Sequence, residues 1–227
     1  MKNQEIHHIH FKTLASTQDY LIHHPELHDK VTLVSTSQQT QGVGQYGREW
    51  DFQSGNLACS GIIATNQVPT LTSLEMSLII SEYFKDKYQI EIKTKWPNDL
   101  LTSDGKKVGG ILLQSLALEK AVVGMGINYS EHAQKEYPYA VGSLHLNVDV
   151  EIEAYHLYHF IITHRKTSEE VLNLWPRTCL HLNQVVSFRD THKEFSGIFK
   201  GIGKQGQALI ETTEGLAEYY SGSIFSF

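Results

Sequence analysis

Apolar and polar residues alternate along residues 90–96. Ile90, Ile92 and Trp96 occupy one set of positions, and charged residues lie between them. A period of two is typical of a half-buried strand. Apolar runs bounded by glycine, proline or asparagine predict further strands at 31–35, 57–64, 108–114 and 121–128.

A helical period replaces this alternation in three stretches. Pro69 and the sequence Thr72-x-x-Glu75 form the pattern of a capping box, which predicts a helix from Thr72 to about Tyr88. The same period predicts helices over 150–166 and 168–174, and we expect Pro176 to limit the second one.

From about residue 184 the pattern changes to short alternating strands separated by glycines, at 185–188, 195–200, 207–212 and 218–220. This pattern is typical of a small all-β barrel. We therefore place a domain boundary near residue 182. The predicted fold class is α+β, with a mixed sheet and flanking helices over 1–182 and a β-barrel over 183–227.

Composition narrows the class of protein. The chain has 227 residues, of which 41% are hydrophobic, so it can bury a core. No apolar stretch approaches the roughly 20 residues of a membrane span, and the start lacks a secretory pattern. Two cysteines exclude a disulfide framework or a zinc cage and fit a reducing cytoplasm.

Charge and histidine spacing give no sign of a general DNA-binding protein or of a histidine metal site. The chain has 19 Lys+Arg against 25 Asp+Glu, a balance that argues against general DNA binding. The thirteen histidines contain no HExxH pattern, and we interpret them as surface or packing residues.

A glycine-rich segment, Gly42-Val-Gly-Gln-Tyr-Gly47, follows a predicted strand and matches G-x-G-x-x-G. A dinucleotide-binding loop would open a helix and be followed about twenty residues later by a carboxylate. Here the loop leads through Arg48 and Trp50 to a turn and a strand, and residues 62–67 contain no carboxylate. The segment is either an ordinary surface loop or a phosphate-binding loop that uses backbone N–H groups and Arg48.

Three more segments combine charged or amide side chains with glycines or a turn: Lys95-Trp-Pro-Asn-Asp-Leu100, Lys106-Lys-Val-Gly-Gly-Ile-Leu112 and Gly124-Met-Gly-Ile-Asn128. Glycines inside a strand indicate that a ligand or another backbone approaches closely. Each segment alone also has a structural explanation, as a core tryptophan, a turn or tight packing.

Together with Leu14–Gln18 and Gln39–Gly42, and in this order, these segments resemble the biotin protein ligase family. The resemblance covers residues 14–128, and residues 201–210 resemble the family's C-terminal SH3-like barrel. It implies a catalytic domain related to class II aminoacyl-tRNA synthetases, in the short form that lacks an N-terminal DNA-binding domain.

The resemblance also implies a two-step reaction. Biotin and ATP, with Mg²⁺, form biotinyl-5′-AMP and pyrophosphate. A lysine of a biotin carboxyl carrier protein, such as that of acetyl-CoA carboxylase, then accepts the biotin. Both nucleophiles are substrates, so the protein would supply positioning and charge neutralisation.

Site residues follow from the matched motifs. The implied catalytic residues are Lys107, on the biotin carboxylate and α-phosphate, with Arg48 and Asp99. Asp99 is either a Mg²⁺ ligand or a turn carboxylate. The implied biotin-binding residues are Ser16, Thr17, Gln18, Gln39, Gly42, Val43, Gly44, Gln45, Lys107, Gly110 and Gly124. The implied ATP-binding residues are Gly47, Arg48, Trp50, Lys95, Asn98 and Asn128.

The glycine loop departs from the family pattern, which has arginines where this chain has Val43 and Gln45. Gln114 also replaces a frequent carboxylate. Either the remaining cations suffice, or the adenylate leaks, or the chain binds biotin and catalyses poorly. The alternatives are a lipoyl or octanoyl transferase and a non-catalytic biotin-binding protein. We expect a cytoplasmic monomer or weak homodimer that binds neither DNA nor membrane.

Overall fold

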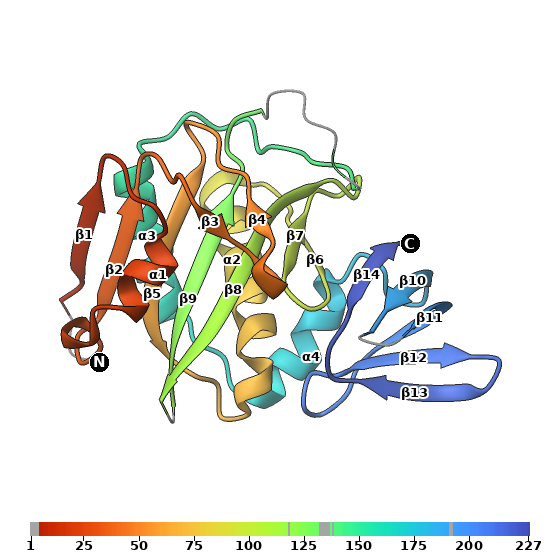
Figure 1. Cartoon of the computed structure of the whole chain (residues 1–227). Helices are drawn as coiled ribbons and strands as arrows, with labels where there is room; N and C mark the ends of the chain where they lie inside the picture. Colours follow the sequence, from red (N-terminus) through yellow and green to blue (C-terminus); the bar gives the residue numbers. More distant parts are fainter. Residues whose placement is uncertain (1–4, 118, 132–136, 138, 191–192) are drawn as a thin grey trace. The chain divides into compact units, whose positions relative to one another are not determined.

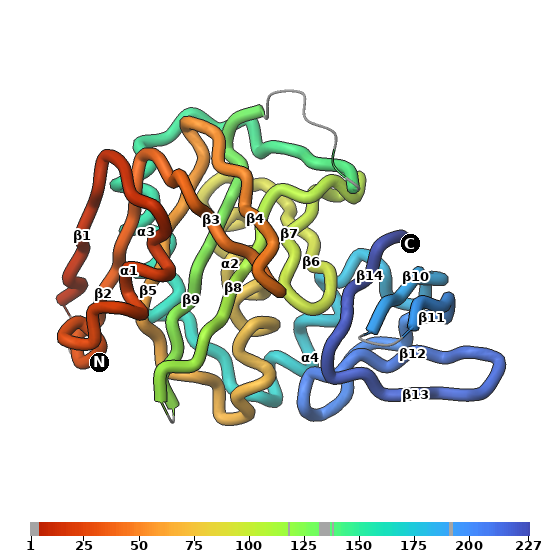
Figure 2. Tube along the Cα trace, in the orientation of Figure 1, coloured from red at the N-terminus to blue at the C-terminus, as the bar shows by residue number. Residues whose placement is uncertain are grey.

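The computed structural model describes residues 5–117, 119–131, 137, 139–190 and 193–227. The chain forms two compact units (Figures 1 and 2). The first comprises Met1–Thr65 and Lys106–Arg165, and the second comprises Asn66–Gly105 and Lys166–Phe227. The domain boundary predicted near residue 182 does not coincide with the division into these two units, and it stays a prediction.

The first unit is built on a mixed sheet. Within it the strand order is β1 (His7–Phe11), β2 (Thr32–Thr36), β5 (Leu57–Ala64), β9 (Lys120–Ile127) and β8 (Lys107–Ala117). The β1–β2 pair is parallel, and the other pairs are antiparallel. The β5 strand consists almost wholly of buried small and β-branched residues, which is typical of a strand covered on both faces.

Two helices cover the two faces of this sheet. The short helix α1 (Thr17–Ile22) contacts β2, β5 and β9, and α3 (Val150–Thr163) contacts β2 and β5. Ser60 bonds Thr17 of α1, whereas a side chain at the next residue, Gly61, would collide with Tyr158 of α3. Because successive strand residues point to opposite faces, the two helices lie on opposite sides (Figure 1). The predicted mixed sheet with flanking helices is confirmed.

A small hairpin crosses the α1 side of the first unit. It joins β3 (Gly42–Val43) to β4 (Glu49–Trp50), with the 3₁₀ turn η2 (Gln45–Gly47) between them. Figure 1 shows it in front of β8 and β9. Further 3₁₀ turns are η1 (Pro25–Leu27) in the first unit and η3 (Pro69–Leu71) in the second.

The second unit combines two helices, a strand pair and an antiparallel sheet. The helices are α2 (Thr72–Tyr88) and α4 (Ser168–Thr178), and β6 (Lys93–Lys95) pairs with β7 (Asp99–Leu101). The sheet has the order β13 (Gly215–Tyr219), β12 (Ala208–Thr212), β11 (Glu194–Ile202), β10 (Val185–Arg189) and β14 (Ser223–Ser226). No β13–β14 pairing occurs among the described residues. The all-β C-terminal part is therefore confirmed, but as an open sheet and not a closed barrel.

The core of the second unit unites these elements. Leu74 of α2, Trp175 of α4 and Phe199 of β11 belong to one buried cluster, which also contains Trp96. The indole Nε1 of Trp96 donates to the backbone oxygen of Gly206 at 2.9 Å. The predicted alternation is confirmed from Glu91 to Trp96, because Ile92, Thr94 and Trp96 are buried while Glu91 is exposed. The strand itself is shorter than predicted, since β6 spans Lys93–Lys95 and Ile90 is half-buried outside it.

Two details of the helix ends differ from the sequence prediction. The carboxylate of Glu75 does not close a capping box with Thr72; it accepts from Asn66 Nδ2 and from the backbone N–H of Lys166. The helix α4 continues past Pro176 to Thr178, because proline at the end of a helix removes a single backbone hydrogen bond. A true capping box joins Thr167 and Glu170 at the start of α4.

None of the helices in the described residues combines the length and apolar character needed to cross a bilayer.

A histidine is enclosed in the core of the second unit. His181 is 0% exposed, its ring lies 4.3 Å from the Phe199 ring, and its Nδ1 lies 3.5 Å from the Cys179 sulfur. Burial lowers the pKa of His181 from 6.5 to about 3; the positive charge of Lys95 acts in the same direction, and Asp99 opposes it. The ring is therefore neutral in the folded protein.

We predict that His181 makes stability depend on pH. The unfolded chain takes up a proton near pH 6.5 and the folded chain does not, so the free energy of unfolding falls as the pH drops from 6.5 towards 3. The expected slope reaches about 1.4 kcal/mol per pH unit. Urea unfolding between about pH 7.5 and 5 measures it. His181→Gln should flatten this dependence, and the exposed control His159→Gln should retain it. Equal slopes in the two variants would contradict the assignment.

Candidate functional site

Five small residues lie together on the α1 face of the first sheet. Residues paired directly across neighbouring strands share a face. The register pairs Ala58 with Gly126, Gly126 with Gly110, and Ser60 with Gly124. We call Ala58, Ser60, Gly110, Gly124 and Gly126 the small-residue floor. It leaves room above the sheet for side chains from other segments.

Gln18 of α1 lies over one part of this floor. A Cβ atom at Gly124 would lie 2.6 Å from Gln18 Oε1, so only glycine allows this approach. Gln18 is 4% exposed, and its Nε2 donates to Val122 O at 3.4 Å. Its Oε1 is buried and has no hydrogen-bond donor among the described residues. A buried acceptor without a partner costs about 1–3 kcal/mol and requires an explanation.

The residues beside Gln18 form a closed hydrogen-bond network. Gln39 Oε1 accepts from the backbone N–H of Thr17 at 3.0 Å and from its hydroxyl at 3.3 Å. The Thr17 hydroxyl also lies 2.9 Å from that of Ser60, and Ser16 Oγ caps α1 by accepting from Asp19 N. The network fixes the start of α1 to the floor and to the segment that leads into the glycine loop.

Trp50 lies over the other part of the floor. A Cβ atom at Gly126 would lie 2.4 Å from Trp50 Cε2, and one at Gly110 would lie 3.3 Å from Trp50 Cζ3. The pairing of Gly42 with Trp50 in the β3–β4 hairpin sets this position. A Cβ at Gly42 would meet Gln39 Nε2 and Trp50 O at 2.7 Å, so glycine is required there too.

The turn of the glycine loop is exposed and carries one cation. Tyr46 and Gly47 adopt positive φ angles of 57° and 70°, and the N–H of Gly44 donates to Arg48 O at 2.7 Å. The guanidinium of Arg48 lies 5.7 Å from the Tyr46 ring. Val43 is 39% exposed, and Gln45 is half-buried.

Lys107 and Asn128 border the floor at the Trp50 end. Lys107 Nζ lies 3.7 Å from where a Gly110 Cβ would stand, and 5.8 Å from the Trp50 ring. Asn128 is 3% exposed, and its Nδ2 donates to Gly142 O at 3.1 Å. Asn128 Oδ1 is the second buried acceptor without a donor among the described residues.

Three predicted residues belong to the second unit and are described with it. Lys95 Nζ forms an ion pair with Asp99 Oδ2 at 2.8 Å and donates to Ile224 O at 3.1 Å. Asn98 is half-buried in the turn between β6 and β7. These contacts fix the Lys95–Leu100 segment to the C-terminal sheet.

The predicted residues of the first unit gather around the floor or on the hairpin above it. Ala58 and Ser60 were not predicted as site residues, and Gly126 was indicated only as part of the Gly124–Asn128 segment. The glycine alternation 124, 126 could have shown Gly126, whereas nothing local distinguishes Ser60. Both cysteines are unsuited to act as nucleophiles, because burial raises the pKa of Cys59 strongly and that of Cys179 to about 12.

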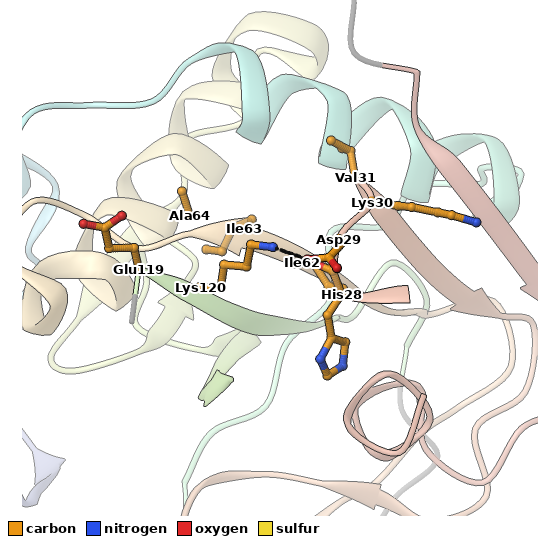
Figure 3. Close-up of a pocket in the computed structure, with 9 residues that line it drawn as sticks. All are labelled: His28, Asp29, Lys30, Val31, Ile62, Ile63, Ala64, Glu119 and Lys120. Atoms are coloured by element: carbon orange, nitrogen blue, oxygen red, sulfur yellow. Dashed lines mark hydrogen bonds and ion pairs between the residues drawn. The ribbon is translucent and has the colours of Figure 1, made fainter. Parts of the chain in front are cut away.

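A separate pocket of about 380 Å³ lies at the other end of β5 and β9. Figure 3 shows the Lys120 side chain directed at Asp29, with which it forms a 2.9 Å ion pair. The side chains of Lys30 and Glu119 point away from each other. None of the predicted site residues lines it. The described residues also contain no cluster of three or more His, Cys, Asp or Glu that could hold a metal.

Comparison with known families gives two matches. Residues 11–128 match the model of the Biotin/lipoate A/B protein ligase family. Residues 181–226 match the model of the Biotin protein ligase C terminal domain.

Relatives and solved structures agree with these matches. The chain is 27% identical over 213 residues to the bifunctional ligase/repressor BirA of Bacillus subtilis, covering 85% of this chain and 65% of that protein. It is 31% identical over 105 residues to the biotin–[acetyl-CoA-carboxylase] ligase of Paracoccus denitrificans, covering 42% of this chain and 43% of that one. The biotin protein ligase of Aquifex aeolicus, solved with biotin and ATP, superimposes with a TM-score of 0.79 and 27% identity, over 96% of this chain and 97% of that chain.

We predict that Gly126→Ala displaces the Trp50 indole, because the added Cβ would lie 2.4 Å from it. Trp96 and Trp175 are 3% and 0% exposed, so a red shift and stronger acrylamide quenching of tryptophan fluorescence would report Trp50. Gly44→Ala is the control, since its Cβ meets its nearest neighbour at 3.5 Å. An unchanged spectrum in Gly126→Ala would contradict the described packing.

Proposed function

Because this chain belongs to the biotin/lipoate A/B protein ligase family, we propose that it is an ATP-dependent biotin–carrier-protein ligase. The observation that carries the proposal is the small-residue floor, bordered by the ammonium of Lys107 and by two buried acceptors for which the described residues supply no donor. Biotin offers matching groups: two ureido N–H donors, an apolar ring system and a carboxylate.

The biotin ring would lie at the α1 end of the floor. There Gln18 Oε1 would accept a ureido N–H, which removes the cost of the unpaired acceptor. Thr17 and Ser60 supply hydroxyls at the same place. Gln39 Oε1 already accepts twice from Thr17, so we assign Gln39 chiefly to holding Thr17 in position. Ser16 likewise acts through its cap on α1.

Lys107 would act where charge accumulates. A biotin carboxylate oxygen attacks the α-phosphorus of ATP, and the bond from this phosphorus to the oxygen that bridges to the β-phosphorus breaks, releasing pyrophosphate. The ammonium of Lys107 and the guanidinium of Arg48 neutralise the crowded anions, and the backbone N–H groups of the glycine loop add donors. Trp50 would cover the adenine, and Asn128 Oδ1 would accept from its amino group.

The second step needs an amine from outside the chain. A deprotonated lysine of the carrier attacks the acyl carbon of the mixed anhydride, and AMP leaves as the amide forms. The name of the Paracoccus denitrificans relative indicates an acetyl-CoA-carboxylase carrier, which we propose as the substrate class. We propose the cytoplasm as the location and a monomer or weak homodimer as the active form.

We further propose that Mg²⁺ enters with ATP, held mainly by phosphate oxygens, as is usual for this ion. Asp99 forms an ion pair with Lys95, and it would supply a single ligand, because it belongs to no cluster of possible metal ligands among the described residues. The proposed roles of Lys95, Asn98 and Asp99 rest on the resemblance of the Lys95–Leu100 segment.

The choice of biotin over a lipoyl or octanoyl group has its own support. The family model covers both kinds of enzyme, but the separate match of residues 181–226 is to a biotin protein ligase domain. Biotin-dependent exchange of pyrophosphate into ATP tests the proposal. Exchange would exclude a non-catalytic biotin-binding protein, and dependence on lipoate or octanoate in place of biotin would overturn the assignment.

We predict that Lys107→Ala slows adenylate formation by about a hundredfold or more, because it removes a fixed charge from the developing anion. The fold should persist, since Lys107 is only half-buried. Pyrophosphate exchange measures the rate, and circular dichroism checks folding. The neighbouring exposed Lys106→Ala is the control and should retain the rate. Near-normal exchange in Lys107→Ala would remove the assignment.

We predict that Gln45→Arg retains the adenylate longer. A charge-assisted hydrogen bond contributes about 1.5–3 kcal/mol, so release of free biotinyl-5′-AMP without a carrier should slow about tenfold or more. Gln41→Arg adds the same charge at an exposed position of the same segment and should have little effect. Equal release from both variants would show that a cation at residue 45 does not reach the phosphate.

A further inference from the structure

Residues 139–142 run beside the start of β8 and fix the backbone of Lys107. The N–H of Lys107 donates to Ala140 O at 2.8 Å, and its carbonyl oxygen accepts from Gly142 N at 2.9 Å. Lys107 and Val141 form a parallel bridge. Tyr139 directly precedes Ala140, so this pairing keeps its backbone close to Lys107.

The Lys107 ammonium lies near two aromatic rings. Its Nζ is 5.3 Å from the centroid of the Tyr139 ring and 5.8 Å from that of Trp50. Both distances lie within the range of cation–π attraction, which extends to about 6 Å. Trp50 is itself fixed by its contact with Gly126 and Gly110.

A hydrogen bond connects the segment that contains Tyr139 to the segment that contains Trp50. The phenol of Tyr137 donates to Asp51 Oδ2, and Asp51 directly follows Trp50. The Tyr137 and Tyr139 rings stack, with centroids 5.9 Å apart and planes at 29°. Partial burial, followed by the bond to Asp51, raises the pKa of Tyr137, which favours the protonated phenol that donates to Asp51.

We propose that Tyr139 is a positioning residue for Lys107. The Tyr137–Asp51 hydrogen bond fixes the Tyr137 ring, and this ring in turn holds the Tyr139 ring that stacks on it. Trp50 and Tyr139 then confine the ammonium to the edge of the small-residue floor. The proposal rests on the proposed function and adds residues to which the comparisons assign no role.

The loop composition gives such positioning a physical purpose. Val43 and Gln45 bring no charge to the glycine loop, so Lys107 carries a larger share of the neutralisation. A lysine side chain is flexible, and a catalytic charge acts best when it is already in place.

The first test measures the contact itself and needs no activity. Aromatic rings shift the NMR signals of protons above them, so the Cε protons of Lys107 should resonate upfield in the full chain. Tyr139→Leu should move them downfield, and Tyr139→Phe, which retains the ring, should leave them in place. Tyr137→Phe, which loses the bond to Asp51, should show part of the downfield movement. No difference between Tyr139→Leu and Tyr139→Phe would overturn the proposal.

The second test measures the consequence for adenylate formation. Tyr139→Leu should lower kcat of biotin-dependent pyrophosphate exchange about three- to tenfold while KM for biotin changes less than about twofold. Tyr139→Phe should restore the rate. The matched control is Tyr155→Leu, because Tyr155 is 39% exposed against 42% for Tyr139 and lies on α3, across the sheet. Loss of rate in Tyr139→Phe, or an effect on KM alone, would contradict positioning.

A double-mutant cycle links the effect to Lys107. Tyr139→Leu should lower the affinity for a non-hydrolysable biotinyl-adenylate analogue. In a chain that already carries Lys107→Met, adding Tyr139→Leu should lower this affinity no further. Additive losses would overturn the proposal. An unmodified chain with no exchange and no analogue binding would instead contradict the proposed function, and the NMR comparison would still decide whether Tyr139 holds Lys107.

Discussion

The structure of the candidate site depends on the absence of bulk at neighbouring positions of one sheet face. Three strands, of which β5 lies far from β8 and β9 in the chain, each contribute glycine, alanine or serine there, and their antiparallel register places these residues side by side. A single added methyl group at Gly124 or Gly126 would collide with a side chain above. The close approach of Gln18 of α1 and of Trp50 of the β3–β4 hairpin to the sheet depends on this constraint.

The polar groups around this floor form two kinds of set. Thr17, Gln39 and Ser60 satisfy one another and make a rigid border. Gln18 and Asn128 instead keep buried acceptors that have no donor within the described part of the chain, and in the proposed function the substrates supply the missing N–H groups. Under that proposal the two sets serve different tasks: the first fixes the shape of the site, and the second would recognise the ligand.

The Lys95–Leu100 segment shows how a motif can serve the fold as well as chemistry. Trp96 is part of the core of the second unit, and its indole donates to Gly206. Lys95 joins Asp99 to the C-terminal sheet through Ile224. The segment thus couples the β6–β7 pair to the C-terminal sheet, and a substitution here would affect the second unit's stability together with any part it has in nucleotide binding.

The sequence by itself determined the strands and helices whose periodicity is strong, because alternation and helical period are local: β5, β9 and α2 were predicted almost to the residue. The sequence also indicated that other groups approach the strands closely at Gly110 and Gly124, and it pointed to Lys107 as the charged residue near Gly110. It did not show α1, β1 or β14, which are short and depend on partners elsewhere in the chain. Nor could it show that Glu75 bonds Lys166, 91 residues away, and not its own helix start. Tertiary structure alone decided that Trp50 covers Gly126 and that Tyr139 faces Lys107, since register and packing bring these residues together and no local pattern encodes either.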